Sequence, residues 1–514
     1  MVELTIFLSL LISVAFAASP CEKPTKDCNN KTSFVNEVKA QTLCSWEKLL
    51  WNDDSVANVC SENQVASKNI PWKFVVINSH VYVLIRSKNP GTYSSLNRFL
   101  ITDAVANTKN TDGSSQCPAL DCYPSCEENQ FFASDTCEAK LPEIIDAVDV
   151  FRDKCGRLWV FDTGCYHNGT QFQCVRASSL TAFSSDDVLL ERISVEEYEY
   201  SETYSAMIVN DDELDCESGE EKIYFYLLDS KRKHIRTYSL NERKFWEFRA
   251  VPFRPEPSES NFEVQISQNQ HFTYTVNTGV KNAVRGPYGL FFHCGAGKYL
   301  YHIPYAVLNN EEASKQNELT FQIEKLTKFN KNGQSVGLLN DGNIFYFLQI
   351  QNGAVACVNG AELKDFQLIT VDKKKFSSTC SIQLYADNTG KKIMVFSNNR
   401  FDIHQNGLNE TQPNFVISYI DPKDVETFYP ECKGHFMDVY RPPGAPADYL
   451  AVDKFQQAAA EKNECPHGKD KKEKVELSRS DEALYQMLLA QILGQQKKLS
   501  PDCMQKQKPV VYGL

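Results

Sequence analysis

The chain has 514 residues, of which 42% are hydrophobic and 23% charged, and its formal net charge is −12. The length suits about three ordinary domains, although a repeat architecture can use the same length as one body. The acidic balance disfavours general binding to nucleic-acid phosphates and makes small cations the more natural ligands. The 18 cysteines spread from Cys21 to Cys503, a usage that disfavours the reducing cytosol.

The chain starts with an apolar segment of the kind that directs secretion. Residues 4–18 carry no charged side chain and end in small residues suited to cleavage. The segment is shorter than the roughly 20 residues that span a bilayer, so we predict a signal peptide over 1–18 and a secreted, extracellular protein. No later stretch is apolar enough to cross a membrane, so no membrane partner is expected. Three sequons agree with the secretory route and predict glycosylation at Asn30, Asn168 and Asn409.

Six runs of aromatic and β-branched residues recur at intervals of about 50 to 80 residues. After most of them a short turn leads to a second extended run, which makes a blade-like unit. This wide spacing favours a radial β-repeat over a sandwich, so we predict an all-β fold, a six-bladed β-propeller. The alternative is two unrelated all-β domains joined in the loop at 252–257. The six runs lie at 80–87, 157–164, 222–230, 288–295, 343–350 and 392–399.

The rest of the chain divides around this repeat region. We predict an N-terminal arm over 19–70, the propeller over 71–432 and a C-terminal extension over 433–514. The extension begins with a Pro-rich linker and contains one amphipathic helix over about 480–493, where apolar residues recur at helical spacing. This partly helical extension either docks on the propeller or mediates self-association.

Motifs for catalysis or cofactor binding are largely missing. The chain has no zinc-protease helix, nucleophile elbow or phosphate-binding loop, and we expect no cofactor and no metal. The segment 295–298, GAGK, partly resembles a phosphate-binding loop but lacks its length and spacing, so we predict a hairpin turn there. Cys122 and Cys126 are predicted in disulfides rather than in a metal knuckle. His293 and His302 lie in strand-like segments and are expected to be structural rather than catalytic.

The segment VDVFRDKCGRLWVFDTG at 148–164 resembles the signature of the Yellow/major royal jelly protein family. The resemblance continues in order from about residue 44 to 432, for example in GPYGLFFHCGAGKYLYHIPYAVL at 286–308 and NIFYFLQIQNGAVACVN at 343–359. It implies a secreted six-bladed propeller. It also implies several functions, because members include pigmentation proteins, proposed dopachrome-converting enzymes, nutritive proteins and salivary proteins that sequester biogenic amines. The fold therefore does not decide the function.

The resemblance also implies ligand-binding residues. In the amine-binding relatives the ligand sits in the central channel, and Thr379, Asn399 and Phe401 stand at comparable places here. An aromatic face attracts an ammonium group by about 0.5–2 kcal/mol, while amide and hydroxyl groups orient the ring substituents. The alternative is that Phe401 is ordinary core and Asn399 a turn residue. An aspartate common in this blade is replaced near Ser381, which predicts a changed or lost ligand.

Six cysteines stand where relatives carry cysteines, and the resemblance implies that they form the core disulfide framework. Cys357 with Cys432 is the first pairing we expect, and each bridge would contribute roughly 2–4 kcal/mol. The six are Cys137, Cys155, Cys174, Cys216, Cys357 and Cys432.

Three functions are compatible with these patterns. The leading hypothesis is a secreted binding protein that holds a small aromatic amine or catechol in the propeller channel without turnover. The second is a dopachrome tautomerase of the pigmentation pathway, which needs a general base; by motif position Asp162 is the only candidate, and its alternative is a structural turn aspartate. The third is a structural or nutritive secreted protein that assembles through its C-terminal extension. A nucleic-acid partner is not expected.

Overall fold

The computed structural model describes most of the chain between residues 38 and 433. The described ranges are 38–52, 68–86, 92–106, 115–129, 142–167, 172–195, 204–218, 222–267, 270–275, 277–316, 322–328, 335–342, 344–360, 366–376, 378–387 and 390–433. The predicted signal peptide, the first half of the predicted arm, the amphipathic helix, Cys137, Asn30 and Asn168 lie outside these ranges. None of the helices in the described ranges combines the length and the apolar character that a membrane crossing requires.

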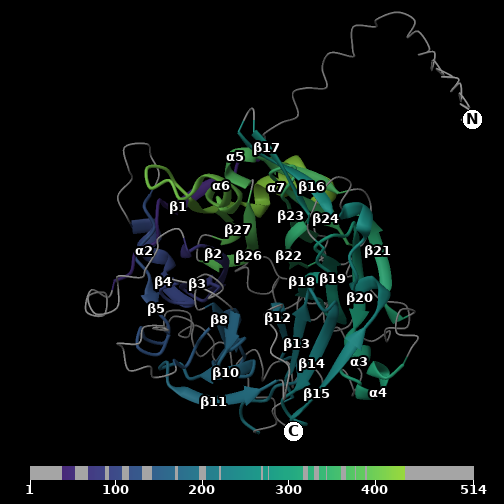
Figure 1. Ribbon diagram of the computed structural model, residues 1–514. Helices are drawn as coiled ribbons and strands as arrows, with labels where there is room; N and C mark the ends of the chain where they lie inside the picture. The colour runs from purple at the N-terminus through teal and green to yellow at the C-terminus, as the bar shows by residue number, and fades with distance from the viewer. Residues whose placement is uncertain are drawn as a thin grey trace, which may run out of the picture. The chain divides into compact units, whose positions relative to one another are not determined.

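Six four-stranded antiparallel sheets surround a central axis and form a six-bladed propeller, as predicted (Figure 1). Blade I contains β2 (Pro71–Ile77), β3 (His80–Ile85), β4 (Leu96–Leu100) and β5 (Asp121–Cys122). Blade II contains β6 (Ala147–Arg152), β7 (Leu158–Asp162), β10 (Ser179–Phe183) and β11 (Leu189–Ser194). Blade III contains β12 (Tyr204–Asn210), β13 (Tyr224–Asp229), β14 (His234–Ser239) and β15 (Lys244–Arg249).

The other three blades follow in chain order. Blade IV contains β18 (Val280–Arg285), β19 (Gly289–Cys294), β20 (Tyr299–Pro304) and β21 (Glu324–Lys328). Blade V contains β22 (Ser335–Asp341), β23 (Ile344–Gln349), β24 (Ala354–Asn359) and β25 (Gln367–Val371). Blade VI contains β26 (Thr379–Asp387), β27 (Gly390–Asn398), β28 (Phe415–Ile420) and β1 (Gln41–Trp46).

The six apolar runs of the sequence correspond to the second strand of each blade, not to the first. A second strand has a strand on either side and a neighbouring blade against each face, so it is buried almost throughout, as in β7 and β23. A fully buried strand reads as a continuous apolar run. The first strands β2, β6, β12, β18, β22 and β26 line the channel and are more polar, so their pattern is weaker.

The ring closes by pairing the start of the described chain with its end. Strand β1 pairs antiparallel with β28, with Gln41 opposite Tyr419 and Trp46 opposite Phe415. The segment expected as an arm thus supplies the outer strand of blade VI. The inner strands contact one another around the ring, including β12 with β18 across the loop at 252–257. The alternative of two separate all-β domains divided at that loop is therefore wrong.

Aromatic and aliphatic side chains fill the spaces between blades. Trp159 of blade II and Phe225 of blade III are both buried and meet edge to face, with ring centroids 4.9 Å apart. Phe291 and Phe345 make a tilted contact between blades IV and V, with centroids 4.7 Å apart. Such aromatic pairs add to the free energy of burial. The core is thus a ring of interfaces, and the channel is left at its centre.

Short elements decorate this ring. Two hairpins, β8 (Cys165–His167) with β9 (Phe172–Cys174) and β16 (Asn261–Ser267) with β17 (Gln270–Thr275), lie outside the blades. Within the described ranges the helices are α2 (Ile101–Ala106), α3 (Tyr305–Leu308), α4 (Glu311–Ser314), α5 (Lys373–Phe376), α6 (Arg400–Asn406) and α7 (Pro422–Phe428). Single 3-10 turns are η3 (Val251–Phe253), η4 (Pro257–Glu259) and η6 (Pro430–Cys432).

Candidate functional site

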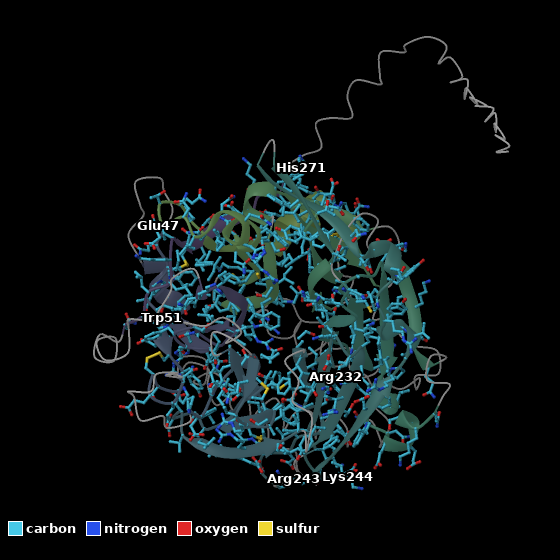
Figure 2. All side chains as sticks on the ribbon, in the orientation of Figure 1. Glu47, Trp51, Arg232, Arg243, Lys244 and His271 are labelled. Atoms are coloured by element: carbon cyan, nitrogen blue, oxygen red, sulfur yellow. A yellow bond between two sulfur atoms is a disulfide. The ribbon has the colours of Figure 1, made fainter. Side chains whose placement is uncertain are left out.

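A cavity of about 1610 Å³ occupies the axis of the propeller and is lined by its six inner strands, by helix α6 and by the β16–β17 hairpin. In Figure 1 β2, β12, β18, β22 and β26 lie around the centre of the ring. Figure 2 labels Arg232 in the β13–β14 turn of blade III, and Arg243 and Lys244 at the periphery of the ring. A concave site at the axis is the usual place for a ligand in such a fold.

The channel has two ends, and each is marked by hydrogen bonds between neighbouring blades. At one end the inner strands begin: Ser205 donates a hydrogen bond to the carbonyl of Lys281 (3.1 Å), and Asn398 donates to the carbonyl of Pro71 (2.5 Å). At the other end they finish: Asn340 donates to the carbonyl of Arg285 (3.1 Å). We call these ends the start mouth and the end mouth.

At the end mouth the charge of Arg285 is neutralised by ion pairs. Arg285 reaches Asp211 with Nη1 (2.8 Å) and Asp212 with Nη2 (2.5 Å). Asp211, which is buried, also accepts a hydrogen bond from the backbone amide of Lys154 at 3.0 Å. These contacts link the ends of β18, β12 and β6, so their role is to hold three blades together.

Charges at the start mouth differ. Lys281 on β18 and Arg400 at the first turn of α6 both line the cavity, and neither side chain forms an ion pair within the described residues. Burial, together with the nearby guanidinium of Arg400, lowers the pKa of Lys281 from 10.5 to about 8, while Cys380 acts in the opposite direction. Lys281 therefore supplies a neutral amine close to physiological pH, which ordinary lysines do not.

The cavity lining carries an excess of positive charge. Among its described residues, eight are lysine or arginine and two are aspartate. Both aspartates already hold cations: Asp149 pairs with Lys73 (2.5 Å) and Asp153 with Arg157 (2.7 Å). The lining thus carries more cations than carboxylates, which favours an anionic ligand, whereas a cationic ligand stays a prediction from the overall charge.

Several buried polar atoms of the lining have no hydrogen-bond partner in the described structure. Thr278 precedes β18, Asn282 follows Lys281, and Thr379 begins β26, so all three lie in the segments that form the start mouth. Thr379 is only 4% exposed, and a buried hydroxyl without a partner is costly. A bound ligand with carbonyl or hydroxyl groups would satisfy these atoms.

Aromatic rings form one wall of the same mouth. Phe401 of α6 lies 4.4 Å from Tyr274 and 6.3 Å from Phe262 between ring centroids, and all three line the cavity. Elsewhere in the lining, the guanidinium of Arg86, which follows β3, lies 5.3 Å from the ring of Trp72 on β2. A flat aromatic ligand fits between such surfaces.

The residues that the resemblance suggested as ligand-binding are partly in the cavity. Thr379 and Phe401 line it, whereas Asn399 donates its side-chain amide to the carbonyl of Pro413 at 3.2 Å. Its neighbour Asn398 lines the cavity instead, and its Oδ1 accepts hydrogen bonds from Ser378 (2.9 Å) and from the amide of Arg400 (3.2 Å). The amide in this part of the lining is therefore one position earlier than the sequence suggested.

Asp162, the base suggested by motif position, is buried away from the cavity lining. Its carboxylate accepts hydrogen bonds from the backbone amides of Ile145 (3.1 Å), Asp146 (2.8 Å) and Gly164 (2.9 Å), and from Arg176 (3.1 Å). All of its acceptor positions are occupied by the protein. Asp162 thus anchors the loop between β7 and β8, as the structural alternative held.

The remaining signature residues also have structural contacts. Asp153 accepts hydrogen bonds from Arg157 Nε (2.7 Å) and Trp159 Nε1 (2.8 Å). His293 is fully buried, its Nδ1 lies 3.0 Å from the carbonyl of Cys294, and burial lowers its pKa to about 4. His302 is also buried, and burial lowers its pKa despite the nearby Glu324. Neither histidine lines the cavity.

The GAGK segment is the turn between β19 and β20. A Cβ on Gly295 would lie 2.1 Å from Thr278 Oγ1 and 3.4 Å from Lys281 Cδ. Glycine here allows the start of β18 to pack directly against the turn. The segment therefore shapes the surroundings of Lys281 and has the predicted hairpin geometry.

Five disulfides occur in the described residues. Cys357–Cys432 is the pairing expected first, and Cys155 pairs with Cys216 within the suggested framework. Cys174 pairs with Cys165, which the framework did not include. The other two bridges are Cys44–Cys117 and Cys122–Cys126.

Two thiols remain free, and no metal cluster accompanies them. Cys294 and Cys380 form no disulfide in the described structure, and burial raises the pKa of Cys380 to about 12. Cys380 borders the cavity as a protonated thiol, not as a nucleophile. In the described ranges no three His, Cys, Asp or Glu side chains are grouped as metal ligands.

Two candidate residues that the sequence did not single out are Lys281 and Arg400, which line the cavity. Lysines and arginines are common on surfaces, and β18 and α6 carry no motif around them. A signal existed in β18 itself: VKNAVR alternates weakly and places a lysine one residue into a strand. Only the ring of inner strands shows that this lysine faces a channel.

Comparisons with known proteins agree with this fold. The sequence model of the major royal jelly protein family matches residues 145–426, more than half of the chain. L-dopachrome tautomerase yellow-f of Drosophila melanogaster is 23% identical over 303 residues, covering 56% of this chain and 65% of the relative. Dopaminechrome tautomerase of the same organism is 22% identical over 250 residues, covering 47% and 51%. The match thus spans less than two thirds of either relative.

Solved structures give weaker matches. Virginiamycin B lyase from Staphylococcus aureus has 10% identity and a TM-score of 0.32, with 70% of this chain and 97% of that chain covered. The computationally designed Ika8 protein has 7% identity and a TM-score of 0.30, with 70% and 72% covered.

Proposed function

The chain belongs to the major royal jelly protein family, and from this premise we propose that it is a secreted tautomerase that isomerises a small indole quinone in its central channel. Two relatives carry the names L-dopachrome tautomerase and dopaminechrome tautomerase. The observation that carries the proposal is Lys281, an unpaired amine with a pKa of about 8 that lines the cavity.

The chemistry asks for one base and for groups that stabilise an oxyanion. In an aminochrome a hydrogen on the five-membered ring leaves as a proton, and the electron pair of that bond moves through the ring system onto a quinone oxygen. The oxygen takes up a proton, and a second such transfer completes the dihydroxyindole. The product is an isomer of the substrate, so no oxidant, reductant or cofactor is consumed.

Lys281 is suited to the role of the base. As a neutral amine it can accept the carbon-bound proton, and a base whose pKa lies near the working pH is the most effective one. The cation of Arg400 keeps the amine from holding its proton too tightly, an arrangement that activates lysines in general. Lys281 then releases this proton to solvent in the channel, and the quinone oxygen takes up a proton from solvent.

Donors at the same mouth are suited to the developing negative charge. The side-chain amide of Asn282 and the hydroxyl of Thr379 are buried and unpartnered. Preorganised donors of this kind, aimed at a position where charge develops, lower a barrier by a few kcal/mol each. The aromatic side chains of Phe401 and Tyr274 would hold the substrate ring within hydrogen-bond distance of these donors.

The direct test follows the decolorisation of L-dopachrome and dopaminechrome by the purified full chain. We expect the protein to accelerate the loss of the aminochrome absorbance and to yield the dihydroxyindole product. Equal slopes with and without protein, at every pH from 6 to 9, would contradict the proposal.

A second candidate is binding of an aromatic amine or catechol without turnover. The cluster of Phe262, Tyr274 and Phe401 favours it, since aromatic faces attract ammonium groups. The positive lining of the channel opposes an amine, because Lys281 and Arg400 would repel it. Titration calorimetry with serotonin, dopamine, octopamine and histamine separates the two candidates: micromolar binding in a protein that does not convert aminochromes favours the binder.

Secretion, glycosylation and assembly complete the proposal. The five disulfides in the described residues support an oxidising compartment, and Asn409 is exposed on a loop before β28, as a glycan acceptor requires. Mass spectrometry of the secreted protein tests both points. Sizing chromatography of the full chain beside a chain ending at Cys432 tests self-association through the extension, the feature that the structural or nutritive hypothesis needs.

A further inference from the structure

Arg400 is distinctive among the arginines that line the channel. Arg86 is held by both oxygens of Asp146 (2.7–3.0 Å), Arg285 is held by Asp211 and Asp212, and Arg152 donates to the carbonyl of Gly156 (2.8 Å). The guanidinium of Arg400 has no such partner in the described part of the chain. Three of these arginines therefore serve the scaffold, and the fourth is available to a ligand.

The backbone of Arg400 is nevertheless fixed. Its amide donates to Asn398 Oδ1 (3.2 Å), and Asn398 in turn binds the carbonyl of Pro71 and the hydroxyl of Ser378. These contacts connect the start of α6 to β2 and to the segment before β26. The side chain consequently starts from a defined point at the start mouth, beside Lys281, whose pKa it lowers.

We propose that Arg400 is the carboxylate-binding residue of the start mouth, so that the channel selects aminochromes that carry a carboxylate over those that do not. A guanidinium binds a carboxylate through two parallel hydrogen bonds, which fixes orientation as well as position. The buried, unpartnered hydroxyl of Thr379 at the same mouth is a second observation that points to a polar ligand. This inference deepens the proposed function and depends on it for the reaction, although not for binding.

The position of Arg400 also explains how the substrate would meet the base. In L-dopachrome the carboxylate is attached to the five-membered ring that loses its hydrogens. A carboxylate bound at Arg400 places that ring beside Lys281, while the quinone oxygens point away from the cation and toward the remaining lining. The same contact cannot form with dopaminechrome, which lacks the carboxylate.

The kinetic test compares substrates with and without the carboxylate. For the Arg400→Gln variant we expect kcat/KM for L-dopachrome to fall about 10- to 100-fold, mainly through KM, as loss of a charged hydrogen bond predicts. For dopaminechrome and L-dopachrome methyl ester we expect only the smaller loss that follows from the higher pKa of Lys281 in this variant. The loss for L-dopachrome should exceed theirs by about tenfold, and Arg400→Lys should restore part of this excess. The matched control is Arg152→Gln at the end mouth, for which we expect kcat/KM for every substrate to equal that of the wild type.

Two results would overturn the assignment. One is an equal loss for the acid and its methyl ester, which would make Arg400 a general structural residue; the other is no loss for the acid. A protein that converts no aminochrome is tested instead by calorimetry with indole-2-carboxylate and indole. A preference for the acid of about tenfold or more, abolished by Arg400→Gln, supports the carboxylate site even where the tautomerase proposal fails, and the absence of any preference refutes it.

Discussion

The two mouths of the channel use the same residue types for opposite purposes. At the end mouth Arg285 forms ion pairs with Asp211 and Asp212, and these pairs join neighbouring blades. At the start mouth Lys281 and Arg400 face the cavity without a carboxylate within the described residues. The difference shows that a lysine or arginine side chain can interact with a ligand where no carboxylate of the protein pairs with it.

The largest expected effect separates the mouths by activity. Lys281→Met should lower kcat for aminochrome conversion by about 10²- to 10⁴-fold, the usual contribution of a positioned base. Arg285→Gln, at the end mouth, should leave kcat within about threefold. Both rates come from decolorisation assays on folded variants of matched circular dichroism. Comparable losses in the two variants would mean that the contrast between the mouths has no catalytic meaning.

Stability should show the reverse order. Asp211→Ala removes a buried carboxylate that holds Arg285 and the amide of Lys154, and should cost about 3 kcal/mol of unfolding free energy. Asp212→Ala removes an exposed partner, with its side chain 53% accessible, and should cost less than about 1 kcal/mol. Urea unfolding measures both. If the two variants were equally stable, the contacts of Asp211 would not be what holds the three blades together.

The pH dependence of the rate follows from the pKa of Lys281. Because the neutral amine is the active form and the pKa is about 8, kcat/KM should rise about tenfold from pH 7 to pH 9 and then level off. In Arg400→Gln the profile should move to higher pH, since a cation that disfavours the protonated amine has been removed. A flat profile in the wild type would exclude Lys281 as the base.

The smallest expected effect is a gain in stability. Below pH 8 Lys281 is charged in the folded and unfolded states alike, so the cost of its partial burial is fully present. Between pH 8 and about 10.5 the folded state loses the proton first, and this cost declines. Lys281→Met should therefore stabilise the protein by about 1 kcal/mol at pH 7, after allowance for water in the channel, and the gain should vanish near pH 10.5. Thermal unfolding of the wild type and the variant at pH 7 and pH 10.5 measures this gain. An equal gain in stability at both pH values would contradict the prediction.

The sequence predicted the architecture because the second strand of each blade is buried on every side. Runs such as those of β7 and β23 are apolar for that reason, and counting them gave six blades. The sequence did not reveal four strands per blade, because inner and outer strands mix polar and apolar residues. It also assigned β1 to an arm, since pairing with β28 joins segments more than 350 residues apart.

The candidate site was less accessible to sequence. Thr379 and Phe401 came from a resemblance and do line the cavity, whereas Asn399 and Asp162 are held by backbone contacts elsewhere. A sequence motif marks positions that must not change, and in Asp153, Asp162 and Trp159 the reason is hydrogen bonding within blade II. Such positions cannot be told from functional ones without their neighbours.

The sequence by itself determined the repeat of widely spaced apolar strands and the number of cysteines, because both depend on local pattern and composition. The overall charge of −12 favours cationic ligands, whereas the tertiary structure shows a cavity lining with more cations than carboxylates. Net charge is a sum over a surface, whereas a ligand meets only the residues that converge on one cavity. Closure of the ring brought Lys281 and Arg400, 119 positions apart in the chain, to one mouth and left them without carboxylates, and no local pattern contains that information.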